Sequence, residues 1–307
     1  MAPSIVAGGS SGTSVRDADV IRLHDDEALF LEALGFTAAS TGFAARLIEE
    51  DYFCTLVLRY LARQQSGLVF KGGTCLAKVH LGFYRLSEDL DFAIPMDPGA
   101  SRGSRRARVA AARKAIAALP GQLQDFHEIE GLTGANDCAQ YNAILGYTSY
   151  LSRQPESIRI EISLRERLLQ PVDEAAANTL LLDPITGEAA APVVRVPCVS
   201  GREAIAEKLR AALSRRDLAI RDFFDVDYAV GRLKVDVQEP GLLMLVMDKL
   251  AVPGNGPVDV SAERIAALRP QVDGQLRPVL RSSDFEAFDL ERAFRTISDL
   301  AAALGRR

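Results

Sequence analysis

Residues 70 to 92 read Phe-Lys-Gly-Gly-Thr-Cys-Leu-Ala-Lys-Val-His-Leu-Gly-Phe-Tyr-Arg-Leu-Ser-Glu-Asp-Leu-Asp-Phe, and this stretch decides the fold. The apolar run Leu68-Val69-Phe70 at its start predicts a buried strand, because it is too short for a buried helix. Gly72 and Gly73 let the backbone turn tightly and approach a ligand closely. Thr74 predicts the N-cap of the helix that follows. Free N–H groups at such a helix start suit a phosphate.

The end of the same stretch predicts a strand that carries two carboxylates. Side chains alternate along a strand, so Asp89 and Asp91 share one face while Leu90 and Phe92 point into the core. Two adjacent carboxylates repel each other unless a cation lies between them, and Mg²⁺ or Mn²⁺ binds carboxylate oxygens together with substrate phosphates. We therefore expect Asp89 and Asp91 to be metal ligands in a site for phosphoryl or nucleotidyl transfer.

A third carboxylate is expected on another strand. Residues 157 to 164 alternate, with Ile158, Ile160, Ile162 and Leu164 on one face and Arg159, Glu161 and Ser163 on the other. A nucleotidyl transfer site needs a further acid to activate the attacking hydroxyl or to complete the metal shell. Glu161 is the best placed candidate, and the alternative is the exposed polar face of an edge strand.

The chain resembles the AbiEii-type nucleotidyltransferase toxins, which include the mycobacterial MenT toxins. The first motif of that family is Lys-Gly-Gly-Thr followed by Arg-x-Ser-x-Asp-x-Asp, and here it reads Lys71 to Thr74 and Arg85 to Asp91. The segment from Glu207 to Leu213, followed by Arg221-Asp222-Phe223-Phe224-Asp225, is similar to a second family motif. The chain departs from the family at Glu50, where the family usually has a lysine.

The resemblance implies an α/β fold of two lobes, a small mixed sheet of about five strands with flanking helices and a helical C-terminal lobe. We expect a flexible N-terminus at 1 to 20, a nucleotidyltransferase domain at 21 to 198 and the helical lobe at 199 to 307, with the active site between the lobes. We also expect helices at 201 to 215 and 220 to 232, and loop with a short helix or strand at 165 to 199, where Pro and Gly recur.

The resemblance also implies roles for individual residues. Lys208 would bind the triphosphate, and Asp222 or Asp225 would hold Lys208 in place or act as a base. Arg85 would brace the Asp pair or touch the triphosphate, and Arg221 can pair with Asp225 four residues on. The residues expected to bind the nucleoside triphosphate are Lys71, Gly72, Gly73, Thr74, Arg85 and Ser87. A phosphate on Ser87 would occupy the site and repel the substrate, which suggests regulation.

The acceptor implied by the resemblance is RNA, most directly the 3′ end of a tRNA, whose modification stops aminoacylation and translation. A growth-inhibiting toxin also implies a cognate antitoxin protein. Two basic clusters, residues 102 to 114 and 208 to 221, are candidates for contacts with RNA phosphates, although the net charge of the chain is −5. Two rivals remain open: a nucleotidyltransferase that modifies a cationic small molecule such as an antibiotic, and a nucleotide-binding regulatory module or kinase-like protein.

Composition sets further bounds on the protein. The 307 residues are 48% hydrophobic and 25% charged, which is typical of a globular protein. The longest apolar run, residues 242 to 247, is too short to span a membrane, and residues 1 to 20 lack the pattern of a signal peptide. The four cysteines are scattered and no pair of the three histidines has ligand spacing, so we expect reduced thiols, no zinc site, no membrane partner and a cytoplasmic location.

Overall fold

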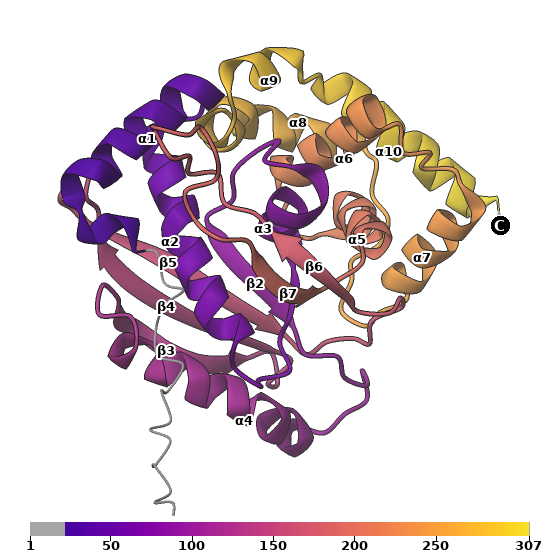
Figure 1. The fold of residues 1–307 in the computed structure, drawn as a ribbon. Helices are drawn as coiled ribbons and strands as arrows, with labels where there is room; N and C mark the ends of the chain where they lie inside the picture. Colours follow the sequence, from indigo (N-terminus) through magenta and orange to yellow (C-terminus); the bar gives the residue numbers. More distant parts are fainter. Residues whose placement is uncertain (1–21, 307) are drawn as a thin grey trace, which may run out of the picture.

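The computed structural model describes residues 22–306, and its centre is one mixed sheet of seven strands (Figure 1). The strand order is β3-β4-β5-β2-β1-β7-β6, in which β2 pairs parallel to β5, β1 pairs parallel to β7, and the remaining neighbours are antiparallel. The strands are β1 (Val69–Lys71), β2 (Asp89–Ala93), β3 (His127–Ala135), β4 (Gln140–Thr148), β5 (Pro155–Ser163), β6 (Asp173–Ala177) and β7 (Val194–Cys198). The predicted flexibility of residues 1 to 20 lies outside the described residues.

The sheet has two strands more than predicted, and both lie in the segment from 165 to 199. In β7 the buried Val194, Val196 and Cys198 alternate with less buried residues, although Pro197 interrupts the sequence signal. The other strand, β6, is an edge strand, so it can be polar and needs no alternating pattern. The predicted alternation in β5 is confirmed, because Ile158, Ile160 and Ile162 are all fully buried.

Ten α-helices surround the sheet within the described residues. They are α1 (Glu27–Thr41), α2 (Ala45–Ala62), α3 (Gly72–Cys75), α4 (Arg102–Ala118), α5 (Gly201–Ser214), α6 (Ile220–Leu233), α7 (Pro240–Leu250), α8 (Ala262–Gln271), α9 (Ser282–Ala287) and α10 (Leu290–Gly305). A π-helical turn at Leu76–Leu81, η2, continues α3. The predicted helices at 201 to 215 and 220 to 232 are confirmed to within one residue.

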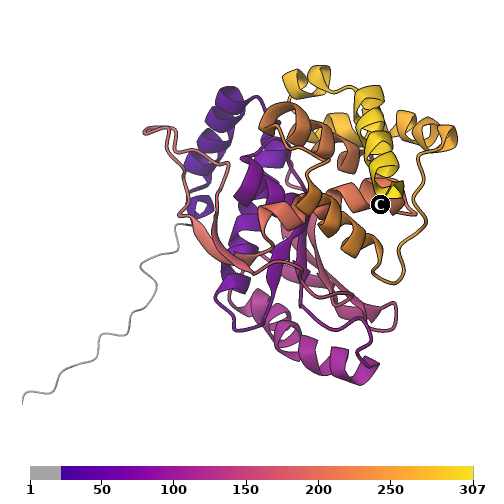
Figure 2. The ribbon, with the colours of Figure 1, turned by 90° about the vertical axis from the view of Figure 1, so that its right-hand side faces the viewer.

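Two hydrophobic cores lie on either side of the glycine turn. Leu90 and Phe92 of β2 join the first core with the buried residues of α2, whereas Val69 of β1 joins the second core with α5, α6, α7 and α10. The helices of the second core gather at one side of the sheet in Figure 2. The second core also includes Leu76, Ala77 and Tyr84, so residues from before position 199 contribute to both cores, and the predicted division near residue 199 stays a prediction.

No single helix in residues 22–306 is long and apolar enough to cross a membrane. Only α1 and α2 taken together match the length and composition of a membrane span, and the chain bends by 115° between them. Most residues of α2 are buried in the first core.

Candidate active site

Gly72 and Gly73 open α3 directly after β1, and each leaves room for a functional side chain. Gly72 has a φ of +77°, a conformation that is strained for residues with a Cβ. A Cβ on Gly72 would lie 2.7 Å from the Cβ of Asp91, and a Cβ on Gly73 would lie 2.5 Å from Nη2 of Arg85. The two glycines therefore bring the backbone against both the acidic and the basic part of the site.

Three neighbouring strands place Lys71, Asp91 and Glu161 in one row across the sheet. Asp91 of β2 is paired with Lys71 of β1 on one side and with Glu161 of β5 on the other. Residues in register on adjacent strands have their side chains on the same face. Asp89 and Asp91 therefore share with Glu161 the face opposite Leu90 and the first core.

The pKa of Asp91 reflects how these acids are grouped. Burial, together with the charges of Glu161 and Asp89, raises the pKa of Asp91 to about 7, and burial raises the pKa of Asp89. Grouped carboxylates of this kind fit a hard divalent cation, which takes oxygen ligands and offsets their repulsion. Asp89, Asp91 and Glu161 are the residues that would hold it.

Lys208 of α5 is oriented by two aspartates of α6. Its Nζ lies 2.8 Å from Oδ1 of Asp222 and 2.9 Å from Oδ2 of Asp225. Burial would lower the pKa of Lys208, but the two aspartates raise it, so this side chain stays charged. Asp222 also lies 3.3 Å from Nη1 of Arg215, which links it to the end of α5.

Asp225 of α6 is fully buried, and it contacts both the segment before β2, at Tyr84 and Arg85, and Lys208 of α5. Oδ1 accepts a hydrogen bond from the Tyr84 hydroxyl at 2.6 Å, and Oδ2 accepts one from Nη2 of Arg85 at 2.8 Å. Burial alone would raise the pKa of Asp225, but Arg85 and Lys208 lower it well below its usual range. Asp225 thus acts as a charged anchor that positions Arg85 and Lys208.

A second ionic contact holds Lys71. Its Nζ lies 2.9 Å from Oε2 of Glu207, the residue before Lys208. Glu207 in turn lies 3.1 Å from Nζ of the buried Lys249 of α7, which also contacts Glu203 and Glu166. Sequence reasoning assigned no role to Glu207 or Lys249. Their pairing could not be read from the chain, because 42 residues separate them.

One cleft of about 870 Å³ brings most of the predicted site together. Ten of the twelve predicted residues line it: Lys71, Gly72, Gly73, Arg85, Ser87, Asp89, Asp91, Glu161, Lys208 and Asp222. The remaining two, Thr74 and Asp225, lie behind its wall. The cleft is large enough for a nucleoside triphosphate, since sites for ligands of that size typically measure about 300 to 1,000 Å³.

The sequence matches the model of the family described as "Nucleotidyl transferase AbiEii toxin, Type IV TA system" over residues 57–298. This match covers most of the chain. The protein belongs to the AbiEii nucleotidyltransferase family. No curated protein sequence matches it significantly.

Two solved structures are partly similar to this AbiEii-family chain. One is JHP933 from Helicobacter pylori, with a TM-score of 0.49 and 16% identity over 86% of this chain and 94% of the other. The second, also from H. pylori, is described provisionally as a nucleotidyltransferase, with a TM-score of 0.44 and 16% identity over 85% of this chain and 95% of the other.

Three expected contacts of the AbiEii-family site are wrong. The N-cap of α3 is Lys71 and not Thr74, whose hydroxyl donates to the carbonyl oxygen of Asp89 and so ties α3 to β2. Arg85 braces Asp225 and not the Asp pair of β2, while its alternative role, a contact with the triphosphate, stays a prediction because Arg85 lines the cleft. Arg221 lies 3.6 Å from Glu88 instead of pairing with Asp225, because Arg85 and Lys208 already occupy that carboxylate.

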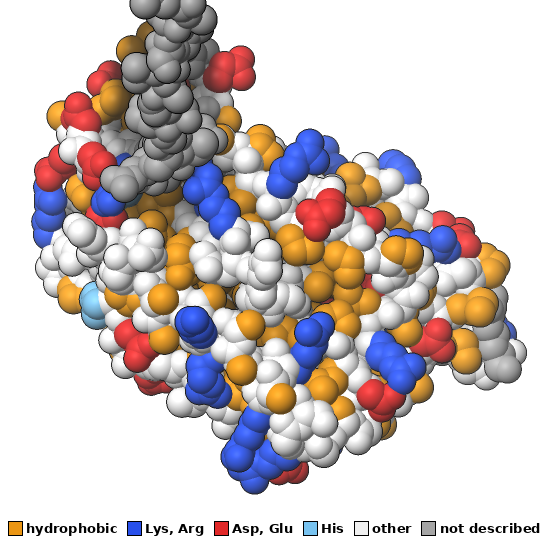
Figure 3. Space-filling model, turned by 60° about the horizontal axis from the view of Figure 1, so that its bottom comes forward, with side chains coloured by type: hydrophobic (Ala, Val, Ile, Leu, Met, Phe, Trp, Pro, Cys, Tyr) orange, Lys and Arg blue, Asp and Glu red, His pale blue; other side chains and the backbone are white. Residues whose placement is uncertain are grey.

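The two basic clusters have different places in this AbiEii-family protein. Lys208, Arg210, Arg215, Arg216 and Arg221 all line the cleft, and none of the residues from 102 to 114 does. The latter cluster lies on α4, which packs against β3 at the far side of the sheet (Figure 1). On the lower face of the molecule, Lys and Arg side chains stand in separate groups, with apolar and uncharged atoms between them (Figure 3).

Proposed function

We propose that this AbiEii nucleotidyltransferase transfers a nucleoside monophosphate from a nucleoside triphosphate to the 3′ end of a tRNA, with a divalent cation bound to the acids of β2. The observation that carries the proposal is the row of Lys71, Asp91 and Glu161 in the same cleft as Lys208. Acids for a cation and a fixed lysine for phosphates are the requirements of nucleotidyl transfer.

In the reaction, an acceptor hydroxyl oxygen attacks the α-phosphorus, and the bond from that phosphorus to the pyrophosphate oxygen breaks. Mg²⁺ or Mn²⁺ on Asp89 and Asp91 would supply Lewis-acid activation of the α-phosphate. Lys208 offsets the charge that develops on the leaving pyrophosphate, and it is held for this task by Asp222 and Asp225. Glu161 either takes the proton of the attacking hydroxyl or completes the metal shell.

The glycine turn suits the triphosphate because the backbone of Gly72 and Gly73 reaches the cleft without side chains. Lys71 lines the same cleft, but Glu207 already offsets its charge. We therefore assign Lys71 a smaller share in phosphate binding than Lys208, and an added role in joining β1 to α5.

The arginines of the cleft support a polyanionic acceptor. Arg165 and Arg216 line it, and neither has a carboxylate within ion-pair distance among residues 22–306. Arg210 contacts the amide oxygen of Asn255 at 3.4 Å and forms no ion pair with an acid in the described part of the chain. Unpaired arginines attract the phosphates of a tRNA and disfavour a cationic antibiotic as acceptor.

The deciding experiment incubates the purified protein with total tRNA, Mg²⁺ and each α-labelled nucleoside triphosphate. We expect label on RNA with wild type, and a loss of about 100-fold or more with Lys208→Ala. Arg216→Glu should weaken tRNA transfer and reduce its dependence on salt, whereas the matched control Arg108→Glu on α4 should not. Pyrophosphate release with a small-molecule acceptor, and no labelled RNA, would overturn the tRNA acceptor.

Control of the activity is the remaining part of the proposal. The toxin–antitoxin class of the family implies a cognate antitoxin partner. Ser87 lines the cleft immediately before β2, and its Oγ would lie 3.1 Å from a Cβ on Gly73. A phosphate on Ser87 would therefore stand beside the glycine turn and compete with the phosphates of the substrate. A protein phosphorylated at Ser87 that kept full transferase activity would contradict this.

A further inference from the structure

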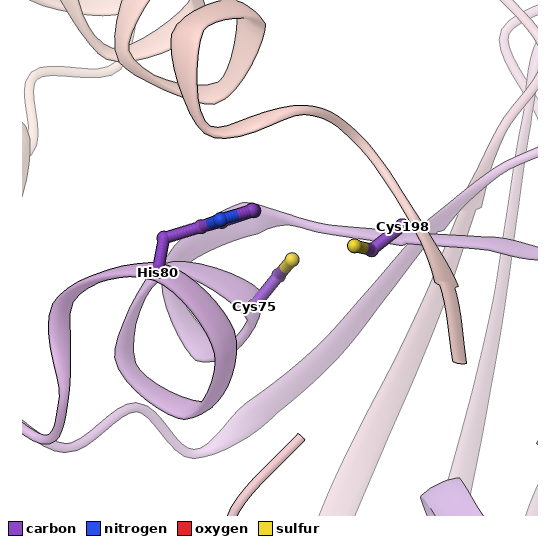
Figure 4. Close-up of side chains that lie close together, drawn as sticks. All are labelled: Cys75, His80 and Cys198. Carbon is purple, nitrogen blue, oxygen red and sulfur yellow. The ribbon is translucent and has the colours of Figure 1, made fainter. Parts of the chain in front are cut away.

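Three side chains that can bind a metal meet beside the glycine turn, outside the proposed metal site of β2. They are Cys75 at the end of α3, His80 in η2 and Cys198 at the end of β7 (Figure 4). One ligand atom from each lies within 4.8 Å of the others, and both cysteines are fully buried. Within residues 22–306 this is the one such group of three Cys, His, Asp or Glu side chains.

The π-helical turn brings the first two ligands together. In an α-helix, residues five apart point in different directions, because one turn takes 3.6 residues. A π-helix closes its hydrogen bonds from residue i to i+5, so Cys75 and His80 come to the same side of η2. Such turns are rare and occur frequently at functional sites. The third ligand, Cys198, is 118 residues beyond His80 and arrives through the pairing of β7 with β1.

The surroundings of the group match those of a metal site. Nε2 of His80 lies 2.9 Å from the carbonyl oxygen of Val199 and can donate its proton there. Histidines that bind metals almost always make such a bond, which leaves the other ring nitrogen, here Nδ1, with a free lone pair.

We propose that Cys75, His80 and Cys198 form a binding site for a soft divalent metal ion, of which Zn²⁺ is the best chemical match. Two thiolates and one imidazole are a ligand set that Zn²⁺ takes in proteins. A tetrahedral site with zinc–sulfur bonds of about 2.3 Å holds its sulfurs about 3.8 Å apart, within the spacing seen here. Binding is ligand exchange: the ion replaces the thiol protons, which pass to solvent, and no group is oxidised.

Asp173 of the edge strand β6 is paired in register with Cys198, so the two side chains share one face of the sheet. Either this carboxylate or a water can complete the coordination. Asp173 is an exposed residue.

The place of the site gives it a function. Cys75 follows the glycine turn by two residues. Cys198 is the last residue of β7, and the next helix in the chain is α5, which carries Lys208. A metal ion bound to both would clamp the nucleotide-binding turn to the strand that leads into the second core. The clamp is independent of the proposed transfer reaction, because none of its three ligands lines the cleft.

The test measures Zn²⁺ binding to the full-length protein, after chelation and reduction, by competition with a chromophoric chelator. We expect one ion per chain, and thiolate-to-metal charge-transfer absorption when Co²⁺ replaces Zn²⁺. Cys198→Ser should weaken binding by more than about 100-fold, the upper range for loss of an outer-shell partner alone. His80→Gln, a change at a half-buried residue that keeps the fold, should weaken it at least about tenfold.

The matched control is Cys138→Ser, which also removes one thiol but lies in the β3–β4 turn away from the group. It should bind Zn²⁺ as wild type does. The proposal fails if the reduced wild-type protein, with four titratable thiols, binds no Zn²⁺. It also fails if Cys198→Ser binds Zn²⁺ as tightly as wild type, or if the protein isolated under reducing conditions carries a disulfide between Cys75 and Cys198.

Discussion

Replacement of Asp225 by asparagine tests whether this residue acts as the buried anchor of the site. The change keeps the shape of the side chain and removes its charge. Arg85 and Lys208 would then lose the carboxylate that lies 2.8 and 2.9 Å from their nitrogens. Loss of one partner of a buried ion pair costs about 3 to 5 kcal/mol, because the remaining charge stays buried without compensation.

Urea denaturation of the full-length protein measures this cost. With a slope of about 3 kcal/mol per molar urea, Asp225→Asn should lower the midpoint by about 1 to 1.7 M. The pKa of Asp225 is depressed in the folded protein, so its contribution is present above the unfolded pKa and is lost as the pH falls through the folded pKa. The gap between wild type and variant should therefore be constant from pH 8 to pH 5, and should narrow below about pH 4.

A matched control lies two residues further along α6. Asp227 also pairs with an arginine, Arg292, at 2.6 Å, but half of the side chain of Arg292 is exposed. Exposed pairs contribute about 0 to 1 kcal/mol, so Asp227→Asn should shift the urea midpoint by no more than about 0.3 M. Equal midpoints for Asp225→Asn and wild type, with equal slopes, would refute the assignment of Asp225 as an anchor.

Three further changes probe the turn and the acids. Gly72→Ala should abolish transfer and destabilise the protein, because its Cβ would meet Asp91 at a φ of +77°, and retained activity would contradict the close approach. Asp91→Asn should lose transfer activity, yet in chelator at pH 8 it should unfold at a higher temperature than wild type. The folded pKa of Asp91 is about 7, so this carboxyl costs stability as the pH rises above its unfolded pKa. The difference in unfolding temperature between variant and wild type should therefore disappear toward pH 4. Ser87→Glu should weaken nucleotide binding, measured by calorimetry, and Ser87→Ala should not.

Much of the site could be predicted from the sequence because its residues are grouped in a few short motifs, the largest of which spans residues 68 to 93. The strand, turn, helix and second strand of residues 68 to 93 form from local signals: two glycines, alternating apolar residues and a pair of aspartates. The choice of Glu161 needed only the period of a strand and the demand for a third acid. Its pairing with Asp91 in the sheet supports that choice, while its chemical role stays a prediction.

The errors have physical causes. The segment from 165 to 199 was expected to be loop with a short helix or strand, and it contains two strands of the sheet, because an edge strand can be polar and Pro197 hides the alternation of its neighbour. Arg85 was expected to brace the nearby Asp pair or to touch the triphosphate, and the first of these is wrong, because its buried guanidinium pairs with the carboxylate of Asp225, 140 residues away. The cysteines looked unrelated for the same reason, since no local spacing shows that β7 returns beside β1.

The sequence by itself was enough to predict the residues of the proposed catalytic chemistry, because the glycine turn, the paired aspartates and the lysine of α5 each occupy a local motif. Only the tertiary structure decided how these motifs act on one another. It places Asp222 in the wall of the cleft and Asp225 outside it. The arginines from 208 to 221 line the cleft and those of α4 do not. It also brings Cys75 and His80 close to Cys198. These outcomes depend on contacts between residues far apart in the chain, whose geometry is set by the packing of the sheet against two cores.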